Sequence, residues 1–462
     1  MPRSPSRWAE RTRAGSVARR IVPAAVGAAL ALAAASCSGR RVATSEGDVG
    51  AARGGAARGG AERGAPSPTR PAQGTARVVR VLLSSTARTS VELSSDGDWR
   101  LYEGGGRSLL ARGIAGRRWR IERVGARRLR AVRDDGEATP ARDGPFLART
   151  LDDRAAVLTW NGRRWRGDLL VVATDSGLLV VNQLGVEEYL RGVVPLEIGA
   201  RPDAERAAAE AQAVAARSYV YVRATGDPRR QWDVVGTVID QVYGGADAEK
   251  VVTDLAIRAT AGEVLTVRGR VVSAPFHAVC GGTTATPDEV WRGTSPEAHL
   301  RSVRDVDPRT GRAWCEPAPR YRWSRSFTAV ALEASLARWV RSQGGAGAPG
   351  RVRTARVERT TASGRVGTLA LETDGGRLEL RGNDIRFALR APGGEILSST
   401  YFSVEPALGR DGRLAELTLR GTGYGHGVGM CQWGAIGRAR AGQDYRRILQ
   451  AYFPGASIER VE

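Results

Sequence analysis

The sequence predicts an α+β fold that is β-rich and two-lobed, with a few helices, an inserted β subdomain and a disordered tether in front. Three observations predict it. Short alternating or wholly apolar runs recur from Val78 to about Asn182, a helical apolar period follows from Asp203 to Arg223, and alternating runs return from Val352. Strand-like and helix-like periods in separate stretches are typical of the α+β class.

The first β-rich stretch contains runs such as Val78 to Leu83 and Leu169 to Ala173, separated by turn residues. Asn161-Gly162 lies between two such runs and is typical of a two-residue hairpin turn. We therefore expect antiparallel strands in this stretch.

The helical period from Asp203 to Arg223 is marked at both ends. Pro202 precedes it and Gly226 follows it, and both residue types favour those positions. Its apolar stripe is mostly alanine, which predicts close packing. Three further helices are predicted, over residues 246–260, 329–341 and 444–452.

The charge of the chain invites a nucleic-acid interpretation, which the rest of the sequence excludes. The net charge is +21, from 70 basic and 49 acidic residues, and because Lys250 is the only lysine, 70 − 1 = 69 are arginines. Residues 1–80 hold 14 arginines and 4 acidic residues, so 14 − 4 = +10 of the excess lies there. No zinc-finger spacing, basic zipper or aromatic ribonucleoprotein strand is present.

The N-terminus predicts export. Six arginines precede an uncharged run from Ile21 to Ala35, and Cys37 follows small residues, as in a bacterial lipoprotein signal. We expect residues 1–37 to be a signal peptide that leaves a lipidated Cys37 in a membrane, with simple cleavage as the alternative. Residues 38–77, rich in Gly, Ala, Arg and Pro, are expected to be a disordered linker.

Glu197 is the first candidate for chemistry. It follows the apolar run Val193-Val194-Pro195-Leu196, and apolar neighbours raise the proton affinity of a carboxyl, as a general acid requires. A solvated loop carboxylate or a helix-capping partner is the alternative on these features alone.

A glycine-rich segment from Gly421 to Ala435 is the second candidate. Tyr424, His426 and Gln432 offer hydrogen bonds there, and Trp433 offers an apolar face that suits a sugar ring. A structural turn is the alternative. Nucleotide binding is excluded because no Gly-Lys-Ser/Thr ending follows the glycines.

Taken in order, these segments resemble the SpoIID/LytB family over about residues 165–460. The resemblance lies in residues 186–219, 240–245, 277–284 with 289–291, and 421–435 with 452–455. It implies an exported protein that acts on peptidoglycan. Members are described as lytic transglycosylases, which cut between N-acetylmuramic acid and N-acetylglucosamine, or as amidase enhancers.

The resemblance also assigns roles to residues. It implies that Glu197 is the catalytic acid and that the glycan strand is bound by Gln212, Arg217, Gln241, Tyr243, Tyr424, His426 and Gln432. Cys431 stands where the family usually has serine. The implied organisation begins with an N-terminal β region (78–165), followed by the first part of the catalytic core (166–325). An inserted or second β-rich lobe (326–415) comes next, and the C-terminal glycine-rich motif with its helix (416–462) ends the chain.

One acid is enough for a lytic transglycosylase, whereas glycoside hydrolases normally use two carboxylates. We therefore expect a lyase with Glu197 as single acid and base and no required cofactor. Asp240 as a second carboxylate would instead favour a hydrolase. A non-catalytic peptidoglycan-binding enhancer of a cell-wall amidase is the main alternative, and an arginine-rich binder of anionic polymers is a third.

A zinc ion is a further hypothesis. His277 and Cys280, with a third ligand such as Cys315, have the donor atoms that zinc prefers. A disulfide between Cys280 and Cys315, or a structural or substrate role for His277, is left open. The expected location is a membrane-anchored lipoprotein facing the cell wall or periplasm, with glycan strands as its partner.

Overall fold

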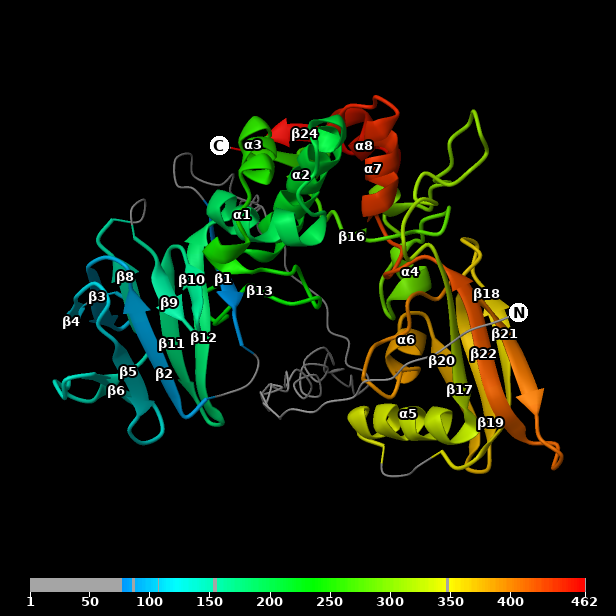
Figure 1. Ribbon diagram of the computed structural model, residues 1–462, viewed down its shortest axis with the longest axis horizontal. Coiled ribbons are helices and arrows are strands. Elements are labelled where there is room, and N and C mark those ends of the chain that lie inside the picture. The colour runs from blue at the N-terminus through cyan, green and yellow to red at the C-terminus, as the bar shows by residue number, and fades with distance from the viewer. Residues whose placement is uncertain (1–76, 85–87, 107, 153–155, 346–348, 462) are drawn as a thin grey trace, which may run out of the picture. The chain divides into compact units, whose positions relative to one another are not determined.

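The computed structural model describes residues 77–84, 88–106, 108–152, 156–345 and 349–461 (Figure 1). The predicted leader, Cys37 and the predicted linker up to residue 76 lie outside these ranges. Among the described helices, none combines the length and apolar character needed to cross a bilayer. Helices and strands occur together along the described chain, so the predicted α+β class is confirmed.

Two sheets form the N-terminal part. A seven-stranded sheet has the order β13-β1-β12-β11-β8-β3-β4, and a six-stranded sheet has the order β10-β9-β2-β5-β6-β7. Trp99 from the first sheet and Trp119 from the second are fully buried in one apolar core. The strands are β1 (Val78–Leu82), β2 (Ser90–Ser95), β3 (Trp99–Glu103), β4 (Ser108–Gly113), β5 (Trp119–Arg123), β6 (Arg128–Arg133), β7 (Arg142–Asp143), β8 (Phe146–Thr150), β9 (Leu158–Trp160), β10 (Arg163–Trp165), β11 (Asp168–Thr174), β12 (Gly177–Gly185) and β13 (Val234–Val235).

The N-terminal sheets extend further along the chain than residue 165. Strand β12 pairs antiparallel with both β1 and β11, so it is an interior strand of the seven-stranded sheet. The β region therefore ends at Gly185, and α1 begins at the next residue, Val186. The predicted hairpin between β9 and β10 is confirmed, because Asn161 (φ 54°) and Gly162 (φ 72°) have the positive φ of a type I′ turn.

A layer of helices follows, with α2 at its centre (Figure 1). Helix α2 packs against α1, α3, α7 and α8, and its alanines are almost all buried, as the alanine stripe predicts. The predicted helix over 246–260 is divided in two by extended Lys250. The elements here are α1 (Val186–Glu197), η1 (Asp203–Glu205), α2 (Arg206–Arg223), η2 (Gly245–Ala248), α3 (Val251–Ala259), β14 (Glu263–Val267), β15 (Arg270–Val271), β16 (Phe276–His277), α4 (Pro287–Val290), η3 (Ala298–Leu300), β23 (Met430–Cys431), α7 (Gln432–Arg440), α8 (Tyr445–Tyr452) and β24 (Ser457–Arg460).

A second lobe has its own apolar core, formed by two three-stranded sheets and two helices. It extends from Arg322 to Thr422 instead of from 326 to 415, because all of β17 pairs with β22, from Arg322 opposite Thr422 to Thr328 opposite Glu416. Its elements are β17 (Arg322–Thr328), α5 (Ala329–Ser342), β18 (Val352–Thr360), β19 (Val366–Thr373), β20 (Gly376–Arg381), α6 (Asp384–Ala388), β21 (Phe402–Leu408) and β22 (Leu414–Thr422).

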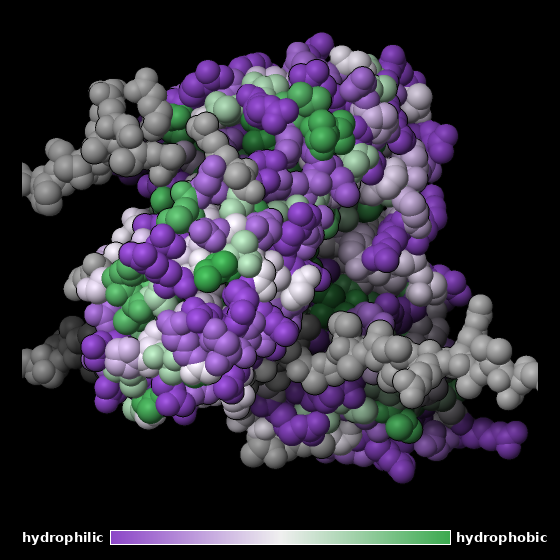
Figure 2. Space-filling model, turned by 60° about the vertical axis from the view of Figure 1, so that its left-hand side comes forward, coloured by the Kyte–Doolittle hydropathy of each residue, from purple (hydrophilic) through white to green (hydrophobic). Residues whose placement is uncertain are grey.

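The surface reflects the arginine bias of the sequence. Most of the face in Figure 2 is hydrophilic, and its apolar residues are scattered. Many surface arginines pair with nearby carboxylates, as Arg117 does with Asp134 at 2.7 Å. Part of the excess positive charge is therefore offset locally.

Candidate active site around Glu197

Helix α1 places Glu197 at its last position. The helix forms despite Pro195 in its final turn, where a proline removes one intrahelical hydrogen bond. Its apolar face compensates, because Val193 and Val194 are fully buried in the main core and Ile198, just after the helix, is 5% exposed. The end of the helix is thereby fixed, and the side chain of Glu197 is half-buried there.

Both carboxylate oxygens of Glu197 accept hydrogen bonds from segments far apart in the sequence. The backbone N–H of Val242 donates to Oε1 at 2.8 Å, and Nε2 of Gln432 donates to Oε2 at 3.3 Å. The same Nε2 lies 3.3 Å from Oε1 of Gln212 on α2. Nε2 of Gln212 is buried and has no hydrogen-bond partner among the described residues. The sequence-predicted residues Glu197, Gln212 and Gln432 are thus brought together.

The surroundings of Glu197 favour its protonated form. Loss of solvent raises the pKa of the Glu197 carboxyl, and the hydrogen bonds from Val242 and Gln432 oppose this effect only in part. No second carboxylate and no arginine contributes to the pKa shift among the described groups. A carboxyl with raised proton affinity and ordered donors has the properties of a general acid.

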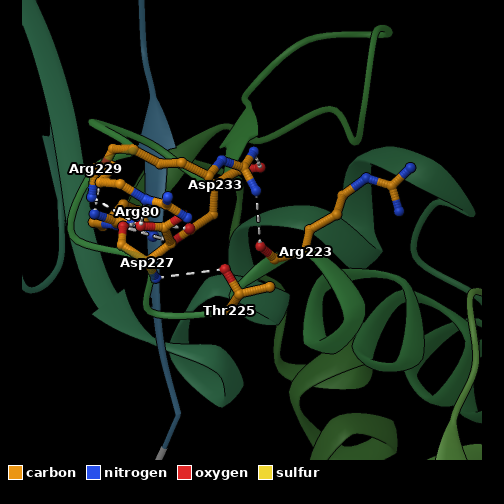
Figure 3. A network of polar contacts seen from close by, with 7 residues as sticks. Arg80, Arg223, Thr225, Asp227, Arg229 and Asp233 are labelled. Carbon is orange, nitrogen blue, oxygen red and sulfur yellow. Dashed lines mark hydrogen bonds and ion pairs between the residues drawn. The ribbon is translucent and has the colours of Figure 1, made fainter. Parts of the chain in front are cut away.

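The segment that supplies the Val242 N–H is anchored to β1. Figure 3 shows Arg80 of β1 held against Asp233, and the structure gives 2.8 Å from Nη2 to Oδ1 and 3.1 Å from Nε to Oδ2. Asp227 in the same network accepts Arg229, and its own N–H lies 3.4 Å from Oγ1 of Thr225. These contacts fix the chain between α2 and β13, which leads into residues 234–243.

Asp240 anchors the other side of this segment. It accepts the hydroxyl of Tyr219 at 2.8 Å and the backbone N–H of Val235 at 2.8 Å, and Arg223 lies 3.3 Å away. Its oxygens are therefore engaged by α2 and by its own loop, and it does not act on the pKa of Glu197.

Gln241 and Tyr243 are buried on either side of Val242. Gln241 accepts the hydroxyl of Tyr189 at 3.0 Å, and the hydroxyl of Tyr243 donates to Asn182 at 2.7 Å. Both side chains hold the loop instead of lining a surface, since they are 0% and 5% exposed. The functional group missed by sequence reasoning is the backbone N–H of Val242, because a main-chain donor leaves no mark in residue identity.

Arg217 is part of the core. Its guanidinium is 0% exposed, pairs with Glu187 of α1 at 2.6 Å and donates to the carbonyl of Glu263 at 3.0 Å. The expectation that Arg217 contacts a glycan needs correction on this point, because the side chain has no accessible surface. It joins α2 to α1 and β14.

The glycine-rich segment lies beside residues 275–279. Strand β23 pairs parallel with β16, which sets Cys431 opposite His277. Gly429 must be glycine here, because a Cβ at this residue would lie 2.1 Å from the carbonyl oxygen of Pro275 and its φ is 73°. The glycines thus permit a close approach of two backbones.

His426, His277 and Trp291 form an aromatic cluster. The ring of His426 lies 5.4 Å from that of His277 and 5.2 Å from that of Trp291. Burial lowers the pKa of His426 to about 3 and lowers the pKa of His277 well below its usual value, so both imidazoles are neutral. Nδ1 of His277 lies 3.1 Å from the carbonyl of Val428, and its buried Nε2 has no partner among the described residues. Tyr424, half-buried, has Arg320 over its ring at 4.8 Å.

The cysteines form a separate group. The sulfurs of Cys280 and Cys315 are 3.5 Å apart, and Cys431 and Asp305 complete a cluster whose ligand atoms all lie within 4.8 Å of one another. His277 is not part of this cluster.

Two protein families and several known proteins match parts of this chain. The profile of the family described as "Stage II sporulation protein" matches residues 174–267, and that of a domain of unknown function (DUF8618) matches residues 288–429. The stage II sporulation protein D of Bacillus subtilis (strain 168) is 28% identical over 299 residues, which are 61% of this chain and 76% of that protein. The amidase enhancer of the same organism is 28% identical over 306 residues, which are 58% of this chain and only 40% of that protein. An uncharacterized protein of Brachyspira hyodysenteriae is 28% identical over 301 residues, 65% of this chain and 73% of that protein.

The fold and the site define an α+β protein with one desolvated, hydrogen-bonded carboxyl at the end of a helix. The matched segment 174–267 contains that carboxyl, its helix and Val242. Over this segment, and in its likeness to the sporulation protein and the amidase enhancer, the chain is similar to the SpoIID/LytB family.

Proposed function

We propose that this protein is a peptidoglycan lytic transglycosylase in which Glu197 is the single acid and base. Similarity to the SpoIID/LytB family supports a cell-wall-related role, and the cleavage chemistry is the proposed refinement of that role. The observation that carries it is the environment of Glu197: desolvation raises its pKa, donors hold both oxygens, and no described carboxylate acts as a partner.

The reaction needs one group that gives and then takes a proton. Protonated Glu197 donates its proton to the glycosidic oxygen as the bond from that oxygen to C1 of N-acetylmuramic acid breaks. The resulting carboxylate then accepts the proton of the C6 hydroxyl, and O6 closes on C1 to give a 1,6-anhydro ring without water. A second carboxylate to activate water or attack C1 is not required.

The residues beside Glu197 support this role. Nε2 of Gln432 contacts the Glu197 carboxyl and also lies 3.3 Å from Oε1 of buried Gln212, so Gln212 helps to position the amide that faces Glu197. The half-buried ring of Trp291, beside His426, offers an apolar face of the kind that sugar rings favour.

The proposal includes export. The basic and apolar leader, Cys37 and the Gly/Ala/Arg/Pro-rich linker are the sequence features that support a lipoprotein tethered by residues 38–77 and facing the cell wall or periplasm. The peptidoglycan strand is the proposed substrate, and no cofactor is needed for the proton transfers described.

A second function is favoured by one comparison. The relative from Bacillus subtilis named amidase enhancer supports a protein that presents glycan to a separate cell-wall amidase and cleaves nothing itself.

One experiment separates these functions. Purified sacculi, intact and stripped of stem peptides, are incubated with the full-length protein, with Glu197→Gln and with Glu188→Gln, and the products are identified by mass. Anhydro-muropeptides from the wild type support the lyase, free stem peptides only when amidase is added support the enhancer, and neither product indicates a binder of the wall.

The control, Glu188→Gln, removes the same carboxylate charge from the same helix. Glu188 also lies on α1 and is half-buried. We expect Glu188→Gln to keep the release of anhydro products and Glu197→Gln to lose it, with both variants folded by circular dichroism. Unchanged release by folded Glu197→Gln would refute the assignment.

A further inference from the structure

The cysteine cluster gathers three distant segments of the chain. Cys280 follows β16, Asp305 and Cys315 lie in the loop after η3, and Cys431 ends β23 and caps the N-terminus of α7. All four side chains are fully buried, and their ligand atoms all lie within 4.8 Å of one another.

The spacing fits one tetrahedral ion. Zinc lies about 2.3 Å from thiolate sulfur and about 2.0 Å from carboxylate oxygen, so the edges of the tetrahedron measure about 3.5 to 3.8 Å. Here Sγ of Cys280 is 3.5 Å from Sγ of Cys315 and 3.3 Å from Oδ2 of Asp305. Small shifts of the four side chains would bring all of their ligand atoms, which now lie within 4.8 Å of one another, to these edge lengths.

Backbone N–H groups already point at the sulfurs. Gly282 donates to Cys280 at 3.3 Å, and Cys280 and Gly434 donate to Cys431 at 3.2 and 3.3 Å. Such donors stabilise a thiolate over a thiol. Gly281 and Gly282 have φ values of 80° and 105°, a conformation that glycine adopts readily and that turns consecutive N–H groups into one concavity.

Two buried arginines adjoin the cluster and balance its charge. Nη2 of Arg438 lies 3.0 Å from Oδ1 of Asp305, and Nη2 of Arg365 donates to the carbonyl of Cys280 at 2.8 Å. Three thiolates and one carboxylate carry four negative charges, which one divalent ion and two guanidinium groups neutralise completely. Tyr452 donates to Asp305 at 2.9 Å and orients that carboxylate in the manner of an outer-shell ligand partner.

We propose that Cys280, Asp305, Cys315 and Cys431 bind one structural zinc ion. Four protein ligands in a fully buried site leave no open position for substrate, so the ion is structural. Thiols that become ligands release their protons to solvent. The ion joins the Cys280 loop, the Asp305–Cys315 loop and the start of α7, and it does so whether or not Glu197 is a catalytic acid.

The test measures the metal directly. Full-length protein carrying Cys37→Ala, which leaves three cysteines, is purified under reducing conditions, and its zinc content is measured by mass spectrometry. We expect about one zinc ion per chain, retention of zinc in His277→Gln, and its loss in Cys315→Ser. Cobalt replacing zinc should give thiolate-to-metal absorption.

A second measurement covers the case in which Cys315→Ser does not fold. A zinc chelator added to the parent protein under reducing conditions should lower its Tm by about 5 to 10 °C, and added zinc should restore it. The proposal is overturned if the purified protein holds no zinc and takes none up, if zinc follows His277 instead of Cys315, or if the unreduced chain holds a disulfide between Cys280 and Cys315.

Discussion

Replacing Gln432 by leucine tests how the site sets the proton affinity of Glu197. The change removes the donor at Oε2 and keeps a side chain of similar volume. A hydrogen bond to a charged group contributes about 1.5 to 3 kcal/mol, and the 3.3 Å distance favours the lower end. Because 1.36 kcal/mol equals one pKa unit, we expect the pKa of Glu197 to rise by about one unit.

The assay is a carbon-13 NMR titration of the glutamate carboxyl groups, in which Glu197→Gln identifies the signal. The pH at which the rate of anhydro-product release declines on the alkaline side should also rise by about one unit, because a general acid must be protonated to act. Gln343→Leu, at an exposed glutamine in the second lobe, is the control and should leave the pKa of Glu197 unchanged. A pKa of Glu197 that falls or stays constant in Gln432→Leu would refute the argument.

Gln432→Leu should also lower the stability of the protein, and only at high pH. A carboxyl whose folded pKa is raised adds stability below its unfolded pKa and loses it as the pH rises through the folded pKa. The donor that Gln432→Leu removes stabilises the charged form of Glu197. The loss of unfolding free energy from that donor should therefore appear only above the folded pKa and amount to about 1.5 kcal/mol.

Two further predictions concern packing and charge. Gly434→Ala would place a Cβ 2.1 Å from the hydroxyl oxygen of Tyr452, so we expect the free energy of unfolding, measured in urea, to fall by about 1 to 3 kcal/mol. In the control Gly185→Ala no atom lies closer than 3.7 Å to the new Cβ, and the free energy of unfolding should change little. Glu187→Ala leaves the guanidinium of Arg217 buried without its carboxylate and should cost about 3 kcal/mol; an unchanged Tm would mean that Arg217 finds another partner.

The sequence predicts best where local pattern and tertiary role agree. Helix α2 was predictable because its apolar stripe, mostly alanine, follows the helical period, and all of its alanines except Ala207 are buried. The hairpin at Asn161-Gly162 was predictable because the turn itself requires positive φ at both residues.

Helices α1 and α7 were not predicted, because their residues disfavour helices locally. Helix α1 contains Pro195 in its last turn, and α7 contains Gly434 and Gly437. Those glycines are required by packing, since a Cβ at Gly437 would lie 2.4 Å from the carbonyl oxygen of Trp314. Propensity measures the isolated chain, whereas these helices are held by tertiary contacts.

At the site, the sequence motifs indicated which segments converge, but not which of their atoms make the contacts. Glu197, Gln212 and Gln432 do converge, but Gln241, Tyr243 and Arg217 turn inward and hold the scaffold. A motif marks residues that are needed, and burial decides whether a side chain meets substrate or supports one that does. That decision depends on contacts between segments far apart in the chain, which a single sequence does not state.

The two sites are joined through consecutive residues. Cys431 lies in the buried cysteine cluster, and Gln432, the first residue of α7, contacts Glu197. Helix α7 carries two glycines, each of which weakens an isolated helix by about 1 kcal/mol, so its position depends on how its first turn is held. The Cys431 sulfur caps that turn through Gly434. An ion that fixes this sulfur would therefore also fix the amide of the next residue, Gln432, which faces Glu197.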